Sequence, residues 1–364
     1  MTSLAVVIAG GGTGGHLYPG IAVAREVLRR VPDARVTFAG TLRGIESRVV
    51  PREGFELDVL RSAGLKSTSA TARLRGLALL PLSGVDAWRI LSRRRPAVVI
   101  GVGGYSSGPV VLAAAARGIP TMLLEQNAVP GLTNRLLGRV VNAAAVTFES
   151  TVSFFGGRAF VAGNPIRQEF LALGGDAGPL GASAVRRVLI FGGSQGAHAI
   201  NMAMVEAAPR LAGRQVALTH QTGERDLESV RDAYRKAGVD ARVEPFLFEM
   251  DREMRAADVV ICRAGATTLA ELTAAGKAAV LIPLPTAADD HQRRNAEVLV
   301  RAGAAEMIEQ KDLTGEAIAE RIAALVADGD RRARMATAAR AFARPDAAGV
   351  IVDRALELAA RGRR

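Results

Sequence analysis

The residues best suited to chemistry lie in two glycine-rich loops, each between an apolar stretch and a helical one. Residues 192–197 read Gly-Gly-Ser-Gln-Gly-Ala and follow the apolar stretch 188–191, and residues 10–16 read Gly-Gly-Gly-Thr-Gly-Gly-His and follow 4–9. Glycines let a backbone turn sharply and approach a ligand closely. A buried strand, such a turn and a helix N-terminus bind anions, because free N–H groups and the helix dipole point at the turn. The sequence therefore predicts two phosphate-binding halves with a site between them.

The first loop also matches the dinucleotide-binding fingerprint, with glycines at positions 10, 12 and 15. That fingerprint requires an acidic residue at the end of the second strand, where it holds a ribose. Here the second strand, 35–39, ends in Gly40-Thr41, and Asp33 precedes it. The pattern therefore weakens a nicotinamide-cofactor interpretation and keeps a phosphate site.

Two side chains are candidates for a catalytic base. His16 directly follows the first glycine loop, and histidine is the residue type suited to act as a base near neutral pH. Glu125 begins the polar group Glu125-Gln126-Asn127 after the apolar stretch 121–124, at the sheet edge where α/β proteins place their sites. Turn and capping chemistry would equally explain Asn127, and the choice between His16 and Glu125 stays open.

A third small-residue segment, 263–271, follows the apolar stretch 258–262. Its Thr268 and Glu271 have the spacing of a capping box, and a ribose-binding carboxylate is the alternative. Asp289-Asp290-His291 could bind a metal, but no second cluster has ligand spacing, so we predict no metal site. No glycine loop is followed by a Walker lysine, which argues against a nucleoside triphosphatase.

The chain length of 364 residues suggests two domains. The turn signal Gly163-Asn164-Pro165 places their boundary, giving domains at 1–161 and 165–343. Pro345 separates the last helix, 346–361, which we expect to pack back on the first domain. Residues 97–116 carry no charge, but their glycines favour a strand, a loop and a helix over a membrane span. In the second domain we expect strands at 188–191, 215–219, 242–244, 258–262 and 278–282, with helices between them.

The formal net charge of +11 suggests an anionic partner, although solvated basic helix faces explain any single arginine equally well. An aromatic content of 4% offers few base-stacking platforms, so we predict no nucleic-acid binding. A single cysteine, Cys262, fits a reducing compartment, and the N-terminus lacks a basic region typical of a signal peptide.

Residues 61–95 combine eight basic residues and one acid with leucines and Trp88, which suits a membrane-surface patch. An ordinary helix pair, broken at Pro81 and Gly84, is the alternative.

Taken together, the motifs resemble the MurG family of bacterial N-acetylglucosaminyltransferases over nearly the whole chain. The stretches that carry the resemblance are 11–16, 103–109, 125–127, 163–167, 192–197, 262–268 and 290–292. The resemblance implies an α/β protein of the GT-B fold, with two Rossmann-like domains whose parallel sheets face a central cleft. It also implies transfer of N-acetylglucosamine from UDP-GlcNAc to the C4 hydroxyl of N-acetylmuramic acid in lipid I, without a cofactor, at the cytoplasmic face of the anionic cell membrane. The product would be lipid II, a precursor of peptidoglycan.

The same resemblance assigns roles to individual residues. Donor contacts would come from Thr13, Gly14, Gly15, Asn127, Arg167, Ser194, Leu247, Ala266, Thr267, Thr268, Glu271 and Gln292. Among these, Ser194 and Arg167 would contact the diphosphate, the backbone at Leu247 the uracil, and Glu271 the ribose. Acceptor contacts would come from Gly103, Gly104, Tyr105 and Ser106. A UDP-sugar epimerase of the same architecture and, less well supported, an NAD-dependent oxidoreductase are the alternative functions.

Overall fold

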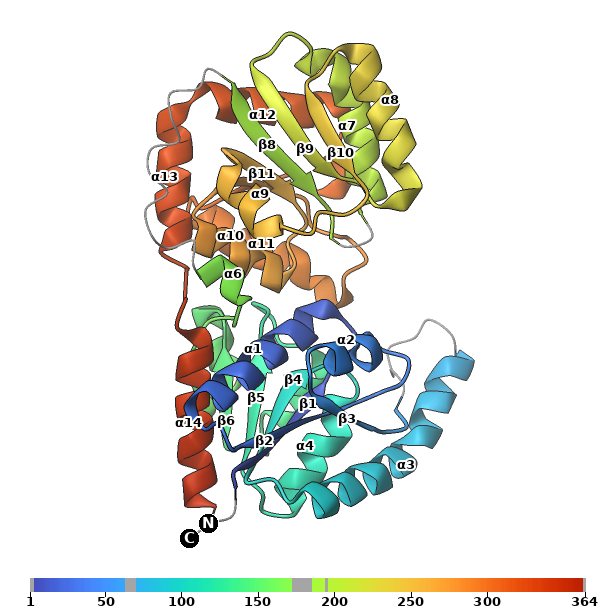
Figure 1. The fold of residues 1–364 in the computed structure, drawn as a ribbon, viewed down its shortest axis with the longest axis vertical. Helices are drawn as coiled ribbons and strands as arrows, with labels where there is room; N and C mark the ends of the chain where they lie inside the picture. Colours follow the sequence, from blue (N-terminus) through green and yellow to red (C-terminus); the bar gives the residue numbers. More distant parts are fainter. Residues whose placement is uncertain (1–2, 63–69, 172–184, 194–195, 363–364) are drawn as a thin grey trace. The chain divides into compact units, whose positions relative to one another are not determined.

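The computed structural model describes residues 3–62, 70–171, 185–193 and 196–362. The chain divides into two compact units, the first formed by residues 1–167 with 344–364 and the second by residues 168–343. Each unit is a parallel β-sheet with helices on both faces (Figure 1). Helices on both faces explain why the central strands read as continuous apolar runs in the sequence.

The first unit contains a seven-stranded sheet in the order β3-β2-β1-β4-β5-β6-β7. Its strands are β1 (Ala5–Gly10), β2 (Arg35–Gly40), β3 (Glu56–Val59), β4 (Val98–Gly103), β5 (Thr121–Glu125), β6 (Ala143–Val146) and β7 (Ala159–Val161). The strand order reverses between β1 and β4, where Val6 pairs with Val36 on one side and Val98 on the other. Ligand sites of open α/β sheets lie at such a reversal, beyond the carboxyl ends of the strands.

Two apolar clusters cover the two faces of this sheet. The helices are α1 (Gly14–Arg30), α2 (Glu46–Arg52), α3 (Ala70–Arg94), α4 (Ser107–Ala116), α5 (Leu132–Leu137) and α14 (Ala347–Arg361). On one face Ile8 packs with Leu17 of α1 and Ile351 of α14, and on the other Val7 packs with Leu91 of α3 and Val110 of α4. The C-terminal helix α14 therefore lies against α1 and β4 (Figure 1).

Two helices of this unit differ from the sequence-based expectation. Residues 70–94 form one continuous helix, α3, with Pro81 inside it, so the expected break at Pro81 and Gly84 was wrong. A proline removes one hydrogen bond and bends a helix without having to end it, and Pro81 lies on the exposed side, while Ala87 and Leu91 anchor the helix in the core. The uncharged stretch 97–116 forms β4, a loop and α4, as predicted. Within the part of the chain that is described, no helix is both long and apolar enough to cross a membrane.

The second unit contains a six-stranded parallel sheet in the order β10-β9-β8-β11-β12-β13. Its strands are β8 (Arg186–Phe191), β9 (Val216–Gln221), β10 (Ala241–Glu244), β11 (Val259–Cys262), β12 (Ala278–Leu281) and β13 (Glu306–Met307). The five strands expected from the sequence are present, and β13 is an additional one. Here the strand order reverses between β8 and β11.

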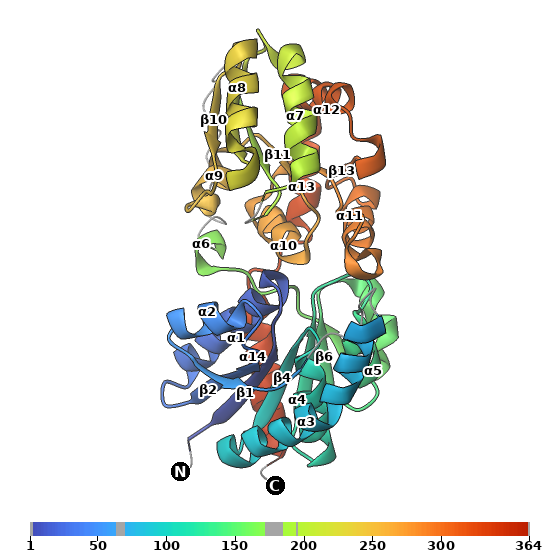
Figure 2. The same ribbon diagram turned by 90° about the vertical axis from the view of Figure 1, so that its right-hand side faces the viewer.

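The helices of the second unit again cover both faces of its sheet. They are α6 (Gln168–Leu171), α7 (His198–Leu211), α8 (Leu227–Ala237), α9 (Met250–Ala256), α10 (Ala266–Ala275), α11 (His291–Arg301), α12 (Gly315–Ala327) and α13 (Gly329–Arg340). Helices α7 and α12 lie side by side on one face, as Figure 2 shows, with Met204 and Ile322 in one apolar cluster.

Candidate functional site

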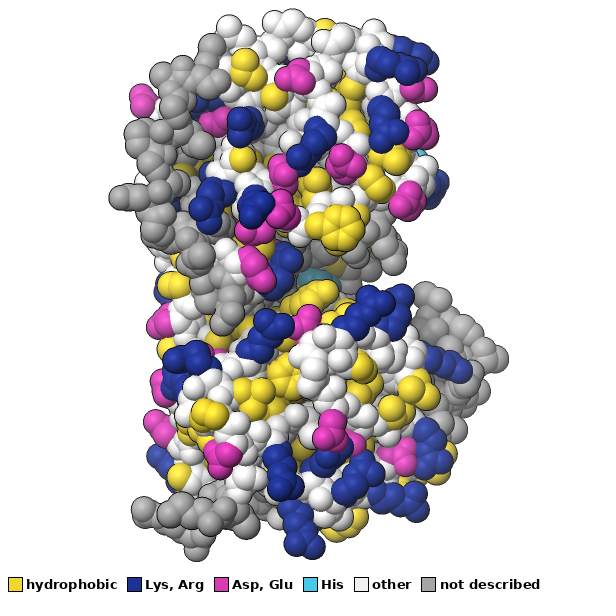
Figure 3. All heavy atoms as spheres, in the orientation of Figure 1, with side chains coloured by type: hydrophobic (Ala, Val, Ile, Leu, Met, Phe, Trp, Pro, Cys, Tyr) yellow, Lys and Arg dark blue, Asp and Glu magenta, His cyan; other side chains and the backbone are white. Residues whose placement is uncertain are grey.

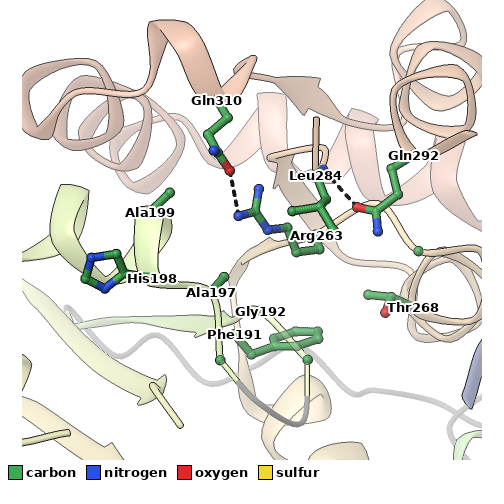
Figure 4. Close-up of a pocket in the computed structure, with 13 residues that line it drawn as sticks. Phe191, Gly192, Ala197, His198, Ala199, Arg263, Thr268, Leu284, Gln292 and Gln310 are labelled. Carbon is green, nitrogen blue, oxygen red and sulfur yellow. Dashed lines mark hydrogen bonds between the residues drawn. The ribbon is translucent and has the colours of Figure 1, made fainter. Parts of the chain in front are cut away.

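A cavity of about 500 Å³ lies at the carboxyl ends of β8 and β11 in the second unit. Three helices, α7, α10 and α11, begin close to it (Figure 4). Its lining consists of Phe191, Gly192, Gly193, Gly196, Ala197, His198, Ala199, Arg263, Gly265, Thr268, Leu284, Gln292 and Gln310. The cavity therefore lies at the reversal of strand order, where the sheet topology predicts a ligand.

The glycine loop after β8 accepts only glycine at several positions. A Cβ on Gly192 would lie 2.1 Å from the Cβ of Ala197, and one on Gly196 would lie 1.8 Å from the carbonyl oxygen of Thr222. Gly193 and Gly196 also have φ values of +102° and +73°, which favour glycine. The loop leads into α7, whose first N–H groups are available to an anion because the capping position is Ala197. Ser194 and Gln195 fall outside the described residues, so the Ser194 contact stays a prediction.

A second helix begins on the other side of the strand reversal. Gly265 caps α10, which starts at Ala266. Thr268 and Glu271 both lie inside this helix, so the capping-box interpretation was wrong, and Thr268 lines the cavity. Two helix N-termini therefore lie at one cavity, which is an arrangement that favours an anionic ligand.

Arg263, which the sequence analysis did not assign, brings a positive charge to the cavity. Its guanidinium donates to the carbonyl oxygens of Ile282 (3.1 Å) and Pro283 (3.2 Å) and to Oε1 of Gln310 (2.8 Å; Figure 4). These partners are neutral, and among the described residues no carboxylate forms an ion pair with Arg263. Desolvation by burial lowers its pKa from the ordinary arginine value. A half-buried cation held by neutral oxygens is suited to an anionic ligand.

The amide of Gln292 and the backbone of Leu247 are each oriented by one hydrogen bond. Oε1 of Gln292 accepts a hydrogen bond from the N–H of Leu284 (3.0 Å), so the amide nitrogen is the group that can donate into the cavity (Figure 4). The N–H of Leu247 donates to Oε1 of Gln221 (3.0 Å), so this hydrogen bond leaves the Leu247 carbonyl unused. Of the predicted donor contacts in the second unit, Thr268 and Gln292 line the cavity, Ala266 and Thr267 adjoin it at the start of α10, and Leu247 and Glu271 lie outside its lining.

The first glycine loop contains a protein carboxylate where a phosphate was expected. Glu46, which is fully buried, accepts hydrogen bonds from the N–H of Gly12 (2.8 Å) and from the N–H and hydroxyl of Thr41 (2.9 Å each). This loop therefore offers fewer N–H groups to a ligand than its glycine pattern predicts. Because one of its amides is already bonded to a carboxylate, the structure also disfavours a dinucleotide at this loop.

The loop after β4 packs directly on the first glycine loop. A Cβ on Gly104 would lie 2.5 Å from the carbonyl oxygen of Gly11, and one on Gly103 would lie 2.8 Å from Cδ2 of His16. The structure thus brings the predicted acceptor residues Gly103 and Gly104 beside Gly11 and His16. Tyr105 places its hydroxyl 3.5 Å from that of Thr41, and Ser106 is the buried cap of α4.

The two candidate bases have different surroundings. Glu125 is 2% exposed and accepts four hydrogen bonds, from the N–H and amide of Asn127, the N–H of Gly131 and the amide of Asn134. Burial raises the pKa of the Glu125 carboxyl, and these donors oppose that shift. His16 is only half-buried, with Nδ1 3.3 Å from the Thr13 hydroxyl. Glu125 therefore organises the 125–134 loop, whereas His16 is accessible to a substrate.

The remaining sequence-based candidates are placed as follows. Arg167 is exposed at the end of the first unit's 1–167 segment. Asp290 forms an ion pair with Arg293 of α11. Within the described ranges, no group of three or more His, Cys, Asp or Glu side chains could hold a metal ion.

Comparisons with known proteins give the same family for both units. The N-terminal domain of glycosyltransferase family 28 matches residues 6–146, and the C-terminal domain of that family matches residues 187–351. A protein of Anaeromyxobacter sp. (strain K), named UDP-N-acetylglucosamine–N-acetylmuramyl-(pentapeptide) pyrophosphoryl-undecaprenol N-acetylglucosamine transferase, is 50% identical over 359 residues, covering 98% of this chain and 93% of that protein.

Similarity to solved structures differs between the two candidate classes, a glycosyltransferase and a UDP-sugar epimerase. The crystal structure of Acinetobacter baumannii MurG is similar at a TM-score of 0.82 and 31% identity, covering 97% of this chain and 99% of that one. A UDP-GlcNAc 2-epimerase from Neisseria meningitidis reaches a TM-score of 0.68 at 14% identity, covering 98% and 100% of the two chains, so it shares the fold alone. The predicted α/β GT-B fold is therefore confirmed, and the chain belongs to the MurG family of N-acetylglucosaminyltransferases within glycosyltransferase family 28.

Proposed function

We propose that this chain transfers N-acetylglucosamine from UDP-GlcNAc to the C4 hydroxyl of N-acetylmuramic acid in lipid I, forming lipid II. The observation that carries the proposal is the cavity of the second unit, where two helix N-termini converge with Arg263, a cation that pairs with no carboxylate among the described residues. Such a site suits the diphosphate of a sugar nucleotide. The relatives' name, which gives this donor and this acceptor, supports the same substrates.

The proposed reaction is a single displacement that inverts the anomeric carbon. The acceptor's C4 hydroxyl attacks that carbon, its proton passes to a base, and UDP leaves from the opposite face. His16 is the base in this proposal, because Glu125 already accepts four hydrogen bonds and is buried. Negative charge builds on the leaving diphosphate, where the N-termini of α7 and α10, together with Arg263, stabilise it.

The residue roles implied by the family resemblance form part of the same proposal. Arg167 and Ser194 bind the diphosphate, the Leu247 carbonyl binds the uracil, Glu271 binds the ribose, and Gln292 donates its amide hydrogen to a sugar oxygen. Ala266, Thr267 and Thr268 line the diphosphate and sugar, Asn127 holds a sugar hydroxyl, and Thr13, Gly14 and Gly15 contact the donor sugar or the acceptor diphosphate. Gly103, Gly104, Tyr105 and Ser106 bind the acceptor.

Radiolabelled sugar transfer tests this function. We expect label from UDP-GlcNAc to appear in the lipid fraction when a lipid I analogue is added, and none of the donor to be converted without it. Conversion of UDP-GlcNAc in the absence of the lipid would instead indicate an epimerase. A labelled lipid that forms in equal amount after His16→Ala would remove His16 from the base role.

We also propose that the chain binds the cytoplasmic face of an anionic membrane through α3. Of the stretch 61–95, residues 63–69 fall outside the described part and the side chains of 70–80 are not described. In the described remainder, Leu82, Val85 and Trp88 are 40%, 45% and 52% exposed. Arg117 of the adjoining segment stacks on Trp88, its guanidinium carbon 4.8 Å from the ring centroid. Exposed apolar side chains next to arginines are suited to a lipid interface.

The distribution of charge favours a local membrane-binding patch over attraction of the whole protein surface to an anionic membrane. Lysine and arginine side chains are spread over the face in Figure 3, with acidic ones among them, so the net charge of +11 does not by itself define a surface. Co-sedimentation with vesicles tests the proposal. We expect binding to anionic vesicles to be weaker in Trp88→Ser than in the parent chain, and equal binding to neutral and anionic vesicles would contradict it.

A further inference from the structure

Gln221, the last residue of β9, connects two loops of the second unit through one buried side chain. It is 2% exposed, and each polar end of its amide bonds to a different loop. Nε2 donates to the carbonyl oxygen of Gly193 (2.8 Å), and Oε1 accepts from the N–H of Leu247 (3.0 Å). Neither the sequence analysis nor the family resemblance assigned this residue a role.

The position of Gln221 in the sheet explains how one side chain reaches both loops. Strand β9 lies between β8 and β10, and Gln221 pairs with Phe191 at the end of β8 and with Glu244 at the end of β10. Gly193 belongs to the glycine loop after β8, which lines the cavity. Leu247 belongs to the segment after β10. The amide therefore spans the carboxyl ends of three neighbouring strands.

The chemistry of the two contacts requires a glutamine. The carbonyl of Gly193 needs a donor and the N–H of Leu247 needs an acceptor, and a primary amide supplies both from one planar group. Glutamate would keep only the acceptor, and methionine would keep neither. The Gly193 carbonyl also accepts from the N–H of Gly196 (2.9 Å), but that bond stays within the glycine loop, and Gln221 supplies the bond that ties the loop to β9. Losing the Gln221 amide therefore unties the glycine loop from β9 and removes the acceptor of the Leu247 N–H.

We propose that Gln221 is a positioning residue that holds the glycine loop and the Leu247 segment at a fixed separation, matched to the diphosphate and base of one nucleotide. The inference rests on the proposed function, since it assigns the two loops to two parts of the same donor. The glycine loop needs such a restraint because Gly193 has the backbone freedom of a positive-φ glycine. Gln221 itself touches neither the sugar nor the reacting atoms in this proposal.

The test compares Gln221→Met and Gln221→Glu with Leu218→Ala. Leu218 is a buried residue of the same strand, and its truncation destabilises the unit without removing either hydrogen bond. UDP affinity by calorimetry, KM and kcat for UDP-GlcNAc, KM for the lipid acceptor and the melting temperature are measured for each variant.

Gln221→Met is expected to weaken UDP binding and raise KM for UDP-GlcNAc by roughly tenfold, since two hydrogen bonds are lost. Changes in kcat and in the acceptor KM should stay within about threefold, because the reacting atoms are not contacted. Gln221→Glu should lose at least as much UDP affinity, since it retains the Leu247 contact but places a carboxylate against the Gly193 carbonyl. Leu218→Ala should lower the melting temperature and leave UDP affinity unchanged.

Unchanged UDP affinity in Gln221→Met would overturn the inference, as would an equal loss of affinity in Leu218→Ala. These results are independent of the acceptor. A parent chain that binds UDP but transfers no sugar to a lipid I analogue would refute the proposed function and leave the Gln221 measurement to be judged on binding alone.

Discussion

Replacement of Arg263 tests whether the cavity of the second unit is a diphosphate site. Arg263→Met removes the charge and keeps much of the apolar stem, whereas Arg263→Lys keeps a charge but loses the planar fork that reaches Ile282, Pro283 and Gln310. The side chain is half-buried, and in the described residues no carboxylate pairs with it, so an incoming diphosphate would be its first anionic partner.

The magnitude follows from the strength of a hydrogen bond to a charged group. Such a bond contributes about 1.5–3 kcal/mol, which corresponds to a roughly 12- to 150-fold change in the dissociation constant. We expect Arg263→Met to weaken UDP binding by a factor in this range. Arg263→Lys should lose less, about threefold to tenfold, because a lysine still provides a positive charge.

Calorimetric titration with UDP and with uridine separates charge recognition from structural damage. Uridine has no phosphate, so its affinity should be nearly the same in Arg263→Met and in the parent chain. The UDP loss should also shrink at high salt, because the lost interaction is electrostatic. Equal weakening of UDP and uridine would mean that Arg263 serves only to hold the 282–283 segment and Gln310, and the reasoning about the diphosphate would be refuted.

Four further perturbations follow from the described contacts. His16→Ala should lower kcat by roughly 10²–10⁴-fold with UDP affinity unchanged, and a loss of UDP affinity instead would assign His16 to binding. Glu125→Ala should destabilise the chain by about 3 kcal/mol or more in denaturant unfolding, because it removes four hydrogen bonds to a buried carboxylate, and a fully stable variant would contradict that role. Gly196→Ala should abolish measurable UDP binding, since its Cβ would meet the Thr222 carbonyl, and normal binding would show that the loop relaxes at little cost. Burial lowers the pKa of His220 to about 3 from an ordinary 6.5, so the unfolded chain takes up a proton between these values that the folded chain does not. Stability should therefore fall by about 2 kcal/mol from pH 7 to pH 5, and this part of the fall should disappear in His220→Gln when the two unfolding curves are compared.

The sequence identified the elements whose signals are local. Glycine loops between apolar and helical stretches were recognised because the turn, the strand and the helix are adjacent in the chain, and β8, β11 and α7 lie as expected. The two-residue strand β13 was missed because Glu306 and Met307 are too short a run to show a period. The continuity of α3 through Pro81 was missed because packing on the core, which anchors Ala87 and Leu91, is not a local property.

The hydrogen bonds that position the loops of the site could not be predicted from sequence patterns. Glu46 accepts a hydrogen bond from the N–H of Gly12, which is 34 residues away in the sequence. Gln221 donates one to the carbonyl oxygen of Gly193, which is 28 residues away. No spacing rule connects such pairs, because only the sheet topology brings them together. Arg263 could have been found, since an arginine directly after a buried strand lies at the carboxyl edge where ligands bind.

The return of the chain to its first unit has a consequence for the order in which the protein is made. Residues 168–343 are inserted between the two parts of the first unit, and α14 supplies Ile351, Val352, Ala355 and Leu358 to the core around β1 and β4. On the ribosome, all of the inserted segment emerges before the helix that completes the older core. The nascent N-terminal sheet must therefore wait with part of one apolar face uncovered until residues 347–361 have been made, and a ribosome stalled near residue 344 would release a chain whose second unit has all its residues while its first unit lacks one helix of its core.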